Sequence, residues 1–269
     1  SFIKSYPLDT LVKILSTFSC LRSLFDELDF FCNSCFMPEL PEVETVKLFL
    51  KKNIMREKIL SIRIENSRLR FPIAKEISNK ITNVTVTKIL RRGKYLLILY
   101  SNDYAVLFHL GMTGFFRLNE CYKFRKHDHI IFNFLDKKLI FNDVRKFGFI
   151  KLYKKKEIFQ CSHIKNLGPE PLSREFSSKY FKNYLGSKTT IKNLLMNQNF
   201  VAGLGNIYCS EILYKSKILP NRLVQTIKNN EIIKIIKDAK IILSNAIKLG
   251  GTTIKNFVVS DQEVGYFKN

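Results

Sequence analysis

The sequence has no run of about 18 or more uncharged apolar residues, the length that a membrane-spanning helix requires, so we expect no membrane segment. Its six cysteines do not follow the spacing of a disulfide-stapled secreted domain, which indicates an intracellular protein. A metal site is not expected either, because the single CxxC pair, Cys32 and Cys35, has no second pair to complete four zinc ligands. We interpret the cysteines as unrelated thiols.

Acidic residues are few, since 23 Asp and Glu stand against 45 Lys and Arg and give a formal net charge of +22. Residues 1–36 carry a net charge of −1, so the excess of +23 lies entirely in residues 37–269. Two explanations stay open at this point. Such a charge can keep a lysine-rich protein in solution, or it can indicate a polyanionic partner, of which nucleic acid is the commonest.

The chain is long enough for two modest domains, and its hydrophobic content of 46% predicts that it folds. Residues 1–36 show only a loose helical spacing of apolar residues, and we interpret them as an extension or upstream fragment outside the functional part. A helix is predicted to start at Pro41, with Val43, Val46 and Leu50 on one face.

Seven short runs rich in Ile, Phe and Tyr follow that helix without helical segments between them, which predicts an antiparallel β-sandwich or barrel. They are TVTKIL, KYLLILY, YAVLFHL, FFRL, HIIFNF, KLIFND and GFIKLY, and NFLDKKLIF predicts a hairpin. The prolines and glycine of NLGPEPLS, residues 166–173, indicate a domain boundary. Beyond it the chain is helical. We therefore expect an α+β protein, with an N-terminal antiparallel β-sandwich and flanking helix at 37–165 and a helical domain at 166–269.

Three helices are predicted in the second domain, in the segments IKNLLMNQ, NIYCSEILYKSKI and NNEIIKIIKDAKIILSNAIKLGG. Thr189 or Thr190 is the expected cap of the first helix. The third helix carries one apolar stripe and ends at Gly250 and Gly251. The stripe consists of Ile232, Ile236, Ala239, Leu243 and Ala246.

The stretch CFMPELPEVETVK, residues 35–47, places Pro38 directly after an internal methionine. If translation starts at Met37 and that residue is removed, Pro38 carries a free secondary amine, which titrates near pH 8, to order of magnitude, and is partly nucleophilic at neutral pH. Attack by such an amine on a carbonyl-like carbon gives an iminium, and Glu39 can hand a proton to a leaving oxygen. The alternative is an ordinary helix start in which proline and glutamates only suit the helix dipole.

Three further motifs contain candidate site residues. RRGKYLL places Lys94 before an apolar strand, where it is either a second acid–base group or a solvated lysine. HLGMTG places Met112 on a glycine-flanked turn, where it projects as a wedge or packs in a core. NDVRKFG places Arg145 and Phe147 two residues apart. On a strand they point the same way, as a wedge into stacked bases would require, or they form an ordinary surface pair.

The segment FVAGLGNIYCSE, residues 200–211, predicts a glycine-containing turn that opens a helix. The free N–H groups at such a helix start bind phosphate, and Gly203 and Gly205 would let the backbone approach the anion closely. Asn206 could add a side-chain hydrogen bond. A single Gly-x-Gly also occurs in many helix connections that bind nothing.

Taken together, eight motifs in this order resemble bacterial formamidopyrimidine-DNA glycosylase, an enzyme that excises 8-oxoguanine and ring-opened purines. They are MPELPEVETV, RRGKYLL, HLGMTG, KHDH, NDVRKFG, NLGPEPLS, GLGNIYCSEIL and GGTTIKNF with the following GYF. The resemblance covers residues 37–269 and includes a helix–two-turn–helix motif at 190–215. It implies a monomer in the bacterial cytoplasm, associated with the nucleoid. The implied partner is double-stranded DNA containing oxidised bases, and the chemistry needs no metal or diffusible cofactor.

The resemblance also implies the residues of the site. Pro38 would be the nucleophile, Glu39 the proton donor and Lys94 the group that assists β-elimination. A wedge would fill the void left by the everted nucleotide, and it consists of Met112, Arg145 and Phe147. The implied phosphate or DNA contacts are His127, Arg145, Lys146, Lys188 and Asn206. Residues 251–266 would fold over the damaged base.

The sequence departs from the family pattern at both ends. A proline nitrogen in an amide bond is not nucleophilic, so we expect that the chain must be trimmed to Pro38 to act. The family continues into a zinc finger with two CxxC pairs, for which this chain has no ligands before Asn269. We therefore expect no zinc, and weaker DNA binding and δ-elimination. Asn197 stands where Asp is common, and we do not expect it to change the reaction.

Other functions stay open on the sequence alone. A related endonuclease VIII-like glycosylase would act on oxidised pyrimidines, although the set Met112, Arg145 and Phe147 favours the purine branch. A non-catalytic DNA-binding fragment would keep the charge but have a blocked amine. A ribosomal-type RNA binder would share the helix–two-turn–helix and the charge, and would not need the wedge.

Overall fold

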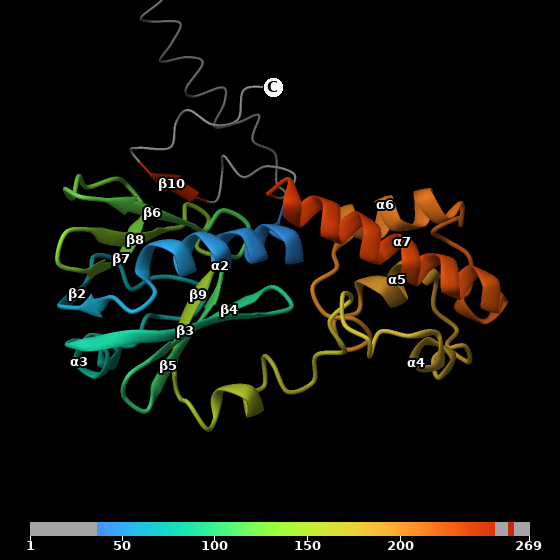
Figure 1. Cartoon of the computed structure of the whole chain (residues 1–269), viewed down its shortest axis with the longest axis horizontal. Coiled ribbons are helices and arrows are strands. Elements are labelled where there is room, and N and C mark those ends of the chain that lie inside the picture. Colours follow the sequence, from blue (N-terminus) through green and yellow to red (C-terminus); the bar gives the residue numbers. More distant parts are fainter. Residues whose placement is uncertain (1–36, 251–257, 261–269) are drawn as a thin grey trace, which may run out of the picture. The chain divides into compact units, whose positions relative to one another are not determined.

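The computed structural model describes residues 37–250 and 258–260 of the chain (Figure 1). The predicted extension, residues 1–36, lies outside the described residues. So does most of the segment 251–266 that was predicted to cover the damaged base. The α+β class is confirmed, because a sandwich of two β-sheets is followed in sequence by a group of helices.

Helix α2 (Leu40–Ile54) forms where the sequence predicts it, with Pro41 in its first turn. Proline suits this position because the first N–H groups of a helix have no partner within it. The Glu42 carboxylate accepts a hydrogen bond from the backbone N–H of Glu39 at 3.0 Å and closes a capping box. The apolar stripe packs against β3 and is no more than 1% exposed, and its members are Val43, Val46, Leu50 and Ile54.

Within the described residues, ten strands form two five-stranded sheets, in the orders β1-β3-β4-β5-β9 and β10-β6-β8-β7-β2. The strands of the first sheet are β1 (Lys58–Ile59), β3 (Val84–Arg92), β4 (Tyr95–Tyr100), β5 (Tyr104–His109) and β9 (Phe149–Lys154). Those of the second are β2 (Ser61–Ile64), β6 (Phe115–Asn119), β7 (Asp128–Asn133), β8 (Lys138–Asn142) and β10 (Val258–Ser260). Neighbours are antiparallel, as predicted, except that β10 pairs with β6 in parallel.

The seven predicted strands and the β7–β8 hairpin are all present. The sequence did not predict β1, β2, β10 or the short helix α3 (Glu76–Lys80), which are too short to show a period. Between the sheets lies a core rich in phenylalanine. The rings of Phe108 and Phe116 meet edge to face at 5.3 Å, a preferred aromatic geometry.

The helical part contains α4 (Ser178–Lys182), α5 (Ile191–Met196), α6 (Asn206–Ser216), α7 (Asn229–Lys248) and a 3-10 turn at Val224–Thr226. A second 3-10 turn, Ile158–Gln160, follows β9 and packs on the first sheet. Thr190 caps α5 through its side chain, as predicted. The stripe of α7 is also confirmed, because Ile232, Ala239 and Leu243 are fully buried. These residues pack with α6 in a second hydrophobic core that is separate from the core of the sandwich.

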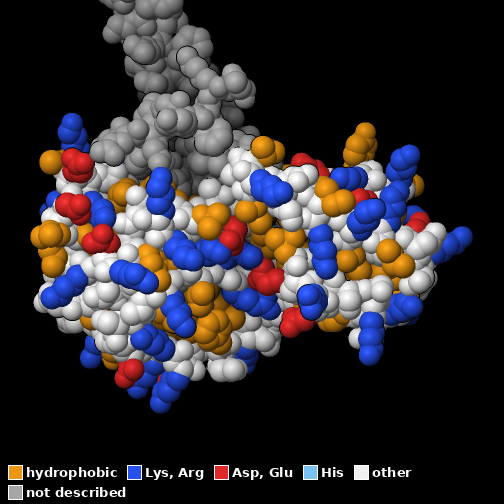
Figure 2. All heavy atoms as spheres, viewed as in Figure 1, with side chains coloured by type: hydrophobic (Ala, Val, Ile, Leu, Met, Phe, Trp, Pro, Cys, Tyr) orange, Lys and Arg blue, Asp and Glu red, His pale blue; other side chains and the backbone are white. Residues whose placement is uncertain are grey.

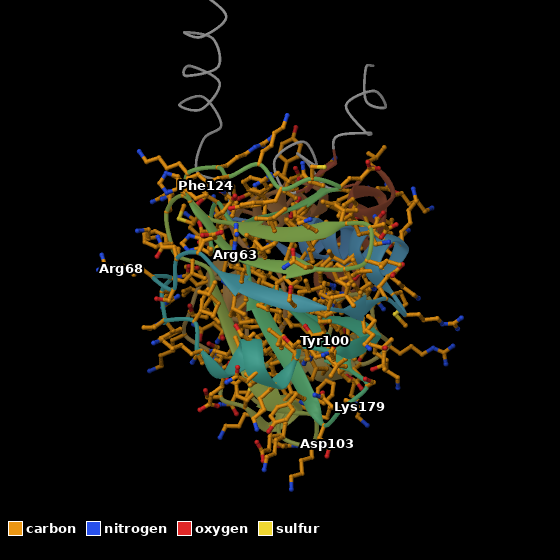
Figure 3. The ribbon with its side chains drawn as sticks, turned by 90° about the vertical axis from the view of Figure 1, so that its left-hand side faces the viewer. Arg63, Arg68, Tyr100, Asp103, Phe124 and Lys179 are labelled. Carbon is orange, nitrogen blue, oxygen red and sulfur yellow. The ribbon has the colours of Figure 1, made fainter. Side chains whose placement is uncertain are left out.

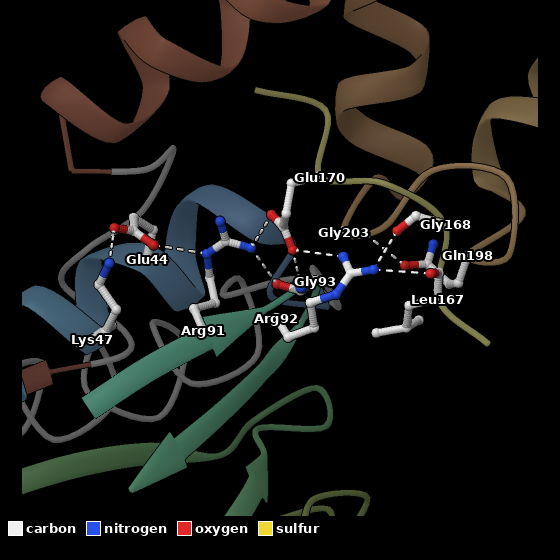
Figure 4. A network of polar contacts seen from close by, with 10 residues as sticks. All are labelled: Glu44, Lys47, Arg91, Arg92, Gly93, Leu167, Gly168, Glu170, Gln198 and Gly203. Carbon is white, nitrogen blue, oxygen red and sulfur yellow. Dashed lines mark hydrogen bonds and ion pairs between the residues drawn. The ribbon is translucent and has the colours of Figure 1, made fainter. Parts of the chain in front are cut away.

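A network of ion pairs joins the β3–β4 turn to the chain around Glu170 (Figure 4). The Glu170 carboxylate accepts hydrogen bonds from Arg91 at 2.7 Å, from Arg92 at 2.9 Å and from the backbone N–H of Gly93 at 2.7 Å. Arg91 also donates to Glu44 of α2 at 2.7 Å. Because one carboxylate binds three consecutive residues, two at the end of β3 and one in the turn, it fixes the backbone immediately before β4.

A fully buried ion pair lies inside the second sheet. Arg117 of β6 and Asp128 of β7 are 2.7 Å apart, and both side chains have 0% exposure. Asp128 also accepts hydrogen bonds from the Asn142 side chain at 2.8 Å and from the backbone N–H of Arg125 at 3.0 Å. The carboxylate is thus surrounded by donors, as a charge without water requires.

We expect Arg117→Met to lower the free energy of unfolding by about 3–5 kcal/mol, because it leaves the Asp128 carboxylate buried without its cation. Urea denaturation followed by circular dichroism measures the change. Arg63→Met is the matched control: Arg63 is 57% exposed in its pair with Glu65, so the loss should stay below about 1 kcal/mol. Equal losses for the two variants would contradict this account of the buried pair.

Candidate active site

Pro38 and Glu39 lie directly before α2 and are both buried. Glu39 is 3% exposed. The backbone N–H of Leu40 donates to the carbonyl of Gly203 at 3.0 Å, which ties this end of α2 to the turn before α6. The two predicted catalytic residues at the start of α2 therefore lie where the sandwich meets the helical part.

The carboxylate of Glu39 occupies the N-terminus of α6. It accepts hydrogen bonds from the backbone N–H groups of Gly205 at 2.6 Å, Ile207 at 2.9 Å and Tyr208 at 3.4 Å. The prediction that this helix start binds a phosphate on free N–H groups is therefore wrong. The anion at the positive end of the α6 dipole is the Glu39 carboxylate of the same protein, which accepts these hydrogen bonds.

Two glycines make this approach possible. A Cβ added at Gly205 would lie 2.5 Å from the Glu39 carboxyl carbon and 2.7 Å from Lys94 Nζ. A Cβ at Gly203 would lie 2.7 Å from Cβ of Leu40, and Gly203 has φ +93°, which L side chains rarely adopt. The sequence predicted close approach at these glycines correctly, but it assigned the wrong anion.

Glu39 and Lys94 both lie next to Gly205, and each affects the pKa of the other through its charge. Burial raises the pKa of the Glu39 carboxyl above its usual range, against the opposing effects of Lys94 and of the N–H donors of α6. Burial also lowers the pKa of the Lys94 ammonium, against the opposing charges of Glu39, Cys209 and Glu42. Both shifts favour the neutral forms, so this acid and this base can exchange protons nearer to neutral pH than in water.

Glu42 and Tyr208 hold Glu39 in place, and the sequence did not predict them as members of the site. Glu42 accepts a hydrogen bond from the backbone of Glu39, and its other carboxylate oxygen accepts one from the Tyr208 hydroxyl at 2.7 Å. This second buried carboxylate joins α2 to α6 beside the first. Its position in PELPE and the tyrosine in GNIY gave no signal, because the contact spans 166 residues of sequence.

His109 is a further residue that the analysis of HLGMTG left unassigned. Burial, together with the positive charge of nearby Lys94, lowers the pKa of His109 to about 4. Its Nδ1 accepts a hydrogen bond from the backbone N–H of Gly111 at 3.1 Å, so Nε2 carries the proton of the neutral ring. A neutral histidine that donates from Nε2 beside Lys94 is a candidate contact for an anionic ligand.

The predicted wedge residues lie on two neighbouring loops. Met112 is half-buried on the turn between β5 and β6. Arg145 and Phe147 lie on the loop between β8 and β9 and not on a strand, so the strand alternation by which they would point the same way does not apply. Lys146 between them has φ +60°, which breaks the alternation of a strand. The guanidinium carbon of Arg145 nevertheless lies 4.9 Å from the centre of the Phe147 ring, which is 46% exposed.

The loop between β8 and β9, called the wedge loop below, is fixed by Asp143. The Asp143 side chain is fully buried. Its carboxylate accepts hydrogen bonds from the Thr113 hydroxyl at 2.5 Å and from the backbone N–H of Gly148 at 2.8 Å. The Thr113 hydroxyl in turn accepts one from the backbone N–H of Arg145 at 3.0 Å. Because Thr113 follows Met112, this chain of bonds holds the turn and the loop in one arrangement.

The predicted DNA contacts fall into different places. His127 lies near Lys146, and its pKa is lowered by burial and by the charges of Lys126 and Lys146. Asn206 is exposed at the first position of α6, next to Glu39. Lys188 is exposed in the segment before α5, and the structure records no contact between it and the other predicted residues in the described ranges.

Lysine and arginine side chains outnumber acidic ones over the face shown in Figure 2. Within residues 37–250 and 258–260, no three side chains of the His, Cys, Asp or Glu type come together to hold a metal ion. Over the same ranges, every helix is too short or too polar to cross a membrane. The expected independence of metals stays a prediction.

Comparisons with known proteins match both halves of the described chain. Residues 37–150 match the family model for the formamidopyrimidine-DNA glycosylase N-terminal domain, and residues 167–258 match that for the formamidopyrimidine-DNA glycosylase H2TH domain. The chain is 42% identical over 238 residues to the formamidopyrimidine-DNA glycosylase of Rickettsia felis, with 86% of this chain and 84% of the relative covered. It is 41% identical over 234 residues to that of Rickettsia canadensis, with 86% and 85% covered.

The fold is also similar to solved structures of Lactococcus lactis Fpg in complexes with DNA. The complex with abasic-site DNA is 37% identical, with a TM-score of 0.76 and 80% of each chain covered. The complex with DNA containing N7-benzyl-Fapy-dG is also 37% identical, with a TM-score of 0.76 and 81% of each chain covered. A complex with DNA containing an oxidised pyrimidine is 38% identical, with a TM-score of 0.76 and 81% and 82% covered.

We expect Gly205→Ala to destabilise the fold by about 1–3 kcal/mol, because the added methyl group would force the Glu39 carboxylate and Lys94 apart. Gly205 has φ −139°, which alanine adopts without strain, so the effect reports the contact and not the backbone. Gly186→Ala is the matched control, since a Cβ there meets nothing within 4 Å, and its effect should stay within about 0.5 kcal/mol. Urea unfolding measures both. An unchanged Gly205→Ala protein would mean that the carboxylate can leave the helix start at no cost.

Proposed function

The chain belongs to the formamidopyrimidine-DNA glycosylase family and is thus a DNA-repair glycosylase, and we propose that it excises oxidised purines from duplex DNA and then cleaves the abasic strand. The observation that carries the proposal is the position of Glu39, a buried carboxyl group of raised pKa that directly follows Pro38 and lies near Lys94, on the same side of Gly205. A nucleophile, a proton donor and a second amine therefore lie together at one point.

The first step is attack of the Pro38 nitrogen on C1′ of the damaged nucleotide. The bond between C1′ and the base breaks, its electron pair leaves with the base, and the base takes up a proton. The sugar ring opens as the C1′–O4′ bond breaks, and protonated Glu39 gives its proton to O4′. The product is an iminium that joins Pro38 to C1′ and acts as an electron sink.

Strand cleavage follows from the acidity of the iminium. Loss of a proton from C2′ expels the 3′ phosphate, and loss of a second proton expels the 5′ phosphate, so that β- and δ-elimination cut the strand on both sides. Neutral Lys94 is the amine placed to take part in these proton transfers, because burial lowers its pKa. Water finally hydrolyses the iminium and releases Pro38.

The site acts on a nucleotide that has left the helix. C1′ cannot be reached inside a stacked duplex, and eversion costs a few kcal/mol in unstacking, to order of magnitude. Met112, Arg145 and Phe147 are proposed to fill the resulting void, which offsets part of this cost. Asp143 supports that role, because it holds their two loops together before DNA arrives. His109, His127, Lys146, Lys188 and Asn206 are the proposed phosphate contacts.

Oxidised pyrimidines are the second candidate substrate class. The Lactococcus lactis relative has been crystallised with DNA containing an oxidised pyrimidine as well as with a Fapy-dG lesion. Duplexes with 8-oxoguanine opposite cytosine and with an oxidised pyrimidine, compared under the same conditions, distinguish the two. We propose that the purine lesion is excised faster.

Covalent trapping tests the nucleophile. The chemistry requires a free secondary amine, so a chain that begins at Pro38 should form a stable adduct with 8-oxoguanine duplex when borohydride reduces the iminium. The matched control is the same chain with Met37 retained, in which the nitrogen is an amide, and it should form no adduct. Denaturing electrophoresis measures both. Salt-sensitive duplex binding without an adduct in either protein would favour a non-catalytic DNA-binding protein instead.

Substitution of Glu39 separates base excision from strand cleavage. We expect Glu39→Gln to slow release of 8-oxoguanine by about 10²–10⁴-fold, because the general acid is lost, while trapping on a preformed abasic site persists. The wild-type excision rate should fall as the pH rises through the raised pKa of Glu39, since only the protonated carboxyl donates. Single-turnover release of the base as a function of pH measures this. A Gln variant with the wild-type pH profile would exclude Glu39 as the donor.

A further inference from the structure

The loop between β6 and β7, residues 120–127, carries exposed cations around an exposed aromatic ring. Lys123, Arg125 and Lys126 are all exposed, and Phe124 between them is 67% exposed. A phenylalanine with so much of its surface in water is not explained by packing. In the part of the chain that the structure describes, none of the three cations pairs with a carboxylate.

The backbone of this loop is held firmly although its side chains point outward. The buried Arg117 donates to the carbonyl of Lys123 at 3.3 Å, and the buried Asp128 accepts from the N–H of Arg125 at 3.0 Å. The Asn142 side chain donates to the carbonyl of Lys126 at 3.1 Å. Hydrogen bonds from the second sheet therefore fix the backbone of the loop that carries the cations.

The loop is continuous with the proposed DNA-binding surface. Its last residue, His127, accepts a hydrogen bond through its carbonyl from the N–H of Asp143 at 3.1 Å, and Asp143 fixes the wedge loop. At the other side, the guanidinium carbon of Arg63 lies 4.7 Å from the centre of the Tyr122 ring. Figure 3 labels Arg63 and Phe124 on the end of the sandwich that lies on the left in Figure 1.

We propose that this loop is a second duplex contact, in which Lys123, Arg125 and Lys126 bind backbone phosphates beyond the lesion and Phe124 packs against the same stretch of duplex. This rests on the proposed function, because it extends the surface that His127 and Lys146 begin. Duplex DNA is the partner that fits, since it repeats negative charge along a line, whereas a protein partner would have to supply carboxylates in the same spacing.

The salt dependence of binding tests the proposal, because each phosphate contact releases counterions. The triple variant Lys123→Gln, Arg125→Gln, Lys126→Gln should reduce the slope of log K against log salt by about 2.7, since each lost contact contributes about 0.9. Fluorescence anisotropy with an undamaged duplex measures the slope. The loss should be equal on a lesion-bearing duplex, because phosphate contacts do not read the base.

Lys154→Gln, Lys155→Gln, Lys156→Gln is the matched control, because it removes the same charge elsewhere. In the register of β5 and β9, Lys154 lies opposite Tyr104, which is at the end of β5 remote from His109. Its slope should equal that of the wild type. Equal slopes for the wild type and the loop variant would overturn the proposal, as would equal reductions in the two triple variants, which would reflect only net charge.

Phe124→Ala tests the ring separately from the charges. It should weaken duplex binding several-fold with an unchanged slope, because an apolar contact releases no counterions. Unchanged affinity would remove Phe124 from the contact. Binding to undamaged duplex requires no chemistry at Pro38, so these results stand apart from the trapping experiment. A loop variant that binds weakly but still forms the borohydride adduct at saturating protein supports the proposal. A wild-type protein that forms no adduct argues only against the catalytic function.

Discussion

The hydrogen bonds from the start of α6 to the Glu39 carboxylate are the contact on which the rest of the site depends. Glu39 directly precedes α2, whose stripe is anchored in the core of the sandwich, while its three N–H partners lie at the start of α6, which packs in the separate core of the helices. A buried carboxylate without donors is costly, so the two cores are stabilised in the one arrangement that satisfies it. The same arrangement places Pro38 and Lys94 at the junction.

Burial of this carboxylate also affects the protonation of Glu39 and of Lys94. Solvent exclusion favours the protonated acid and the neutral amine, while the dipole of α6 and the opposing charge favour the ionised pair. Burial is the larger influence on both groups, so the pKa of the Glu39 carboxyl is raised and that of the Lys94 ammonium is lowered.

Much of the fold could be predicted from the sequence because its signals are local. The seven long strands, α2, the capped α5 and the stripe of α7 each follow from a period or a cap within a few residues. Elements that depend on distant partners could not be predicted. β1 and β2 are too short to show a period, and β10 pairs with β6, which is distant from it in the sequence.

The candidate site shows the same difference between local signals and contacts of distant residues. The motifs predicted a site that contains Pro38, Lys94 and the wedge residues, because the proposed chemistry restricts which side chains occur there. They could not show that Glu39 occupies the start of α6, since no local rule says which anion reaches a helix dipole first. The left-handed backbone of Lys146, between Arg145 and Phe147, is not visible in the sequence either. Glu42 and Tyr208 were missed because their contact joins residues far apart in the sequence. The burial that lowers the pKa of His109 also has no local signal.

The parallel pairing of β10 with β6 means that the polypeptide passes from the sandwich to the helices and back again. Residues Val258–Ser260 therefore add to the second sheet only where β6 is already in place. The stability of this strand depends on the sandwich, although the strand follows the helices in the sequence.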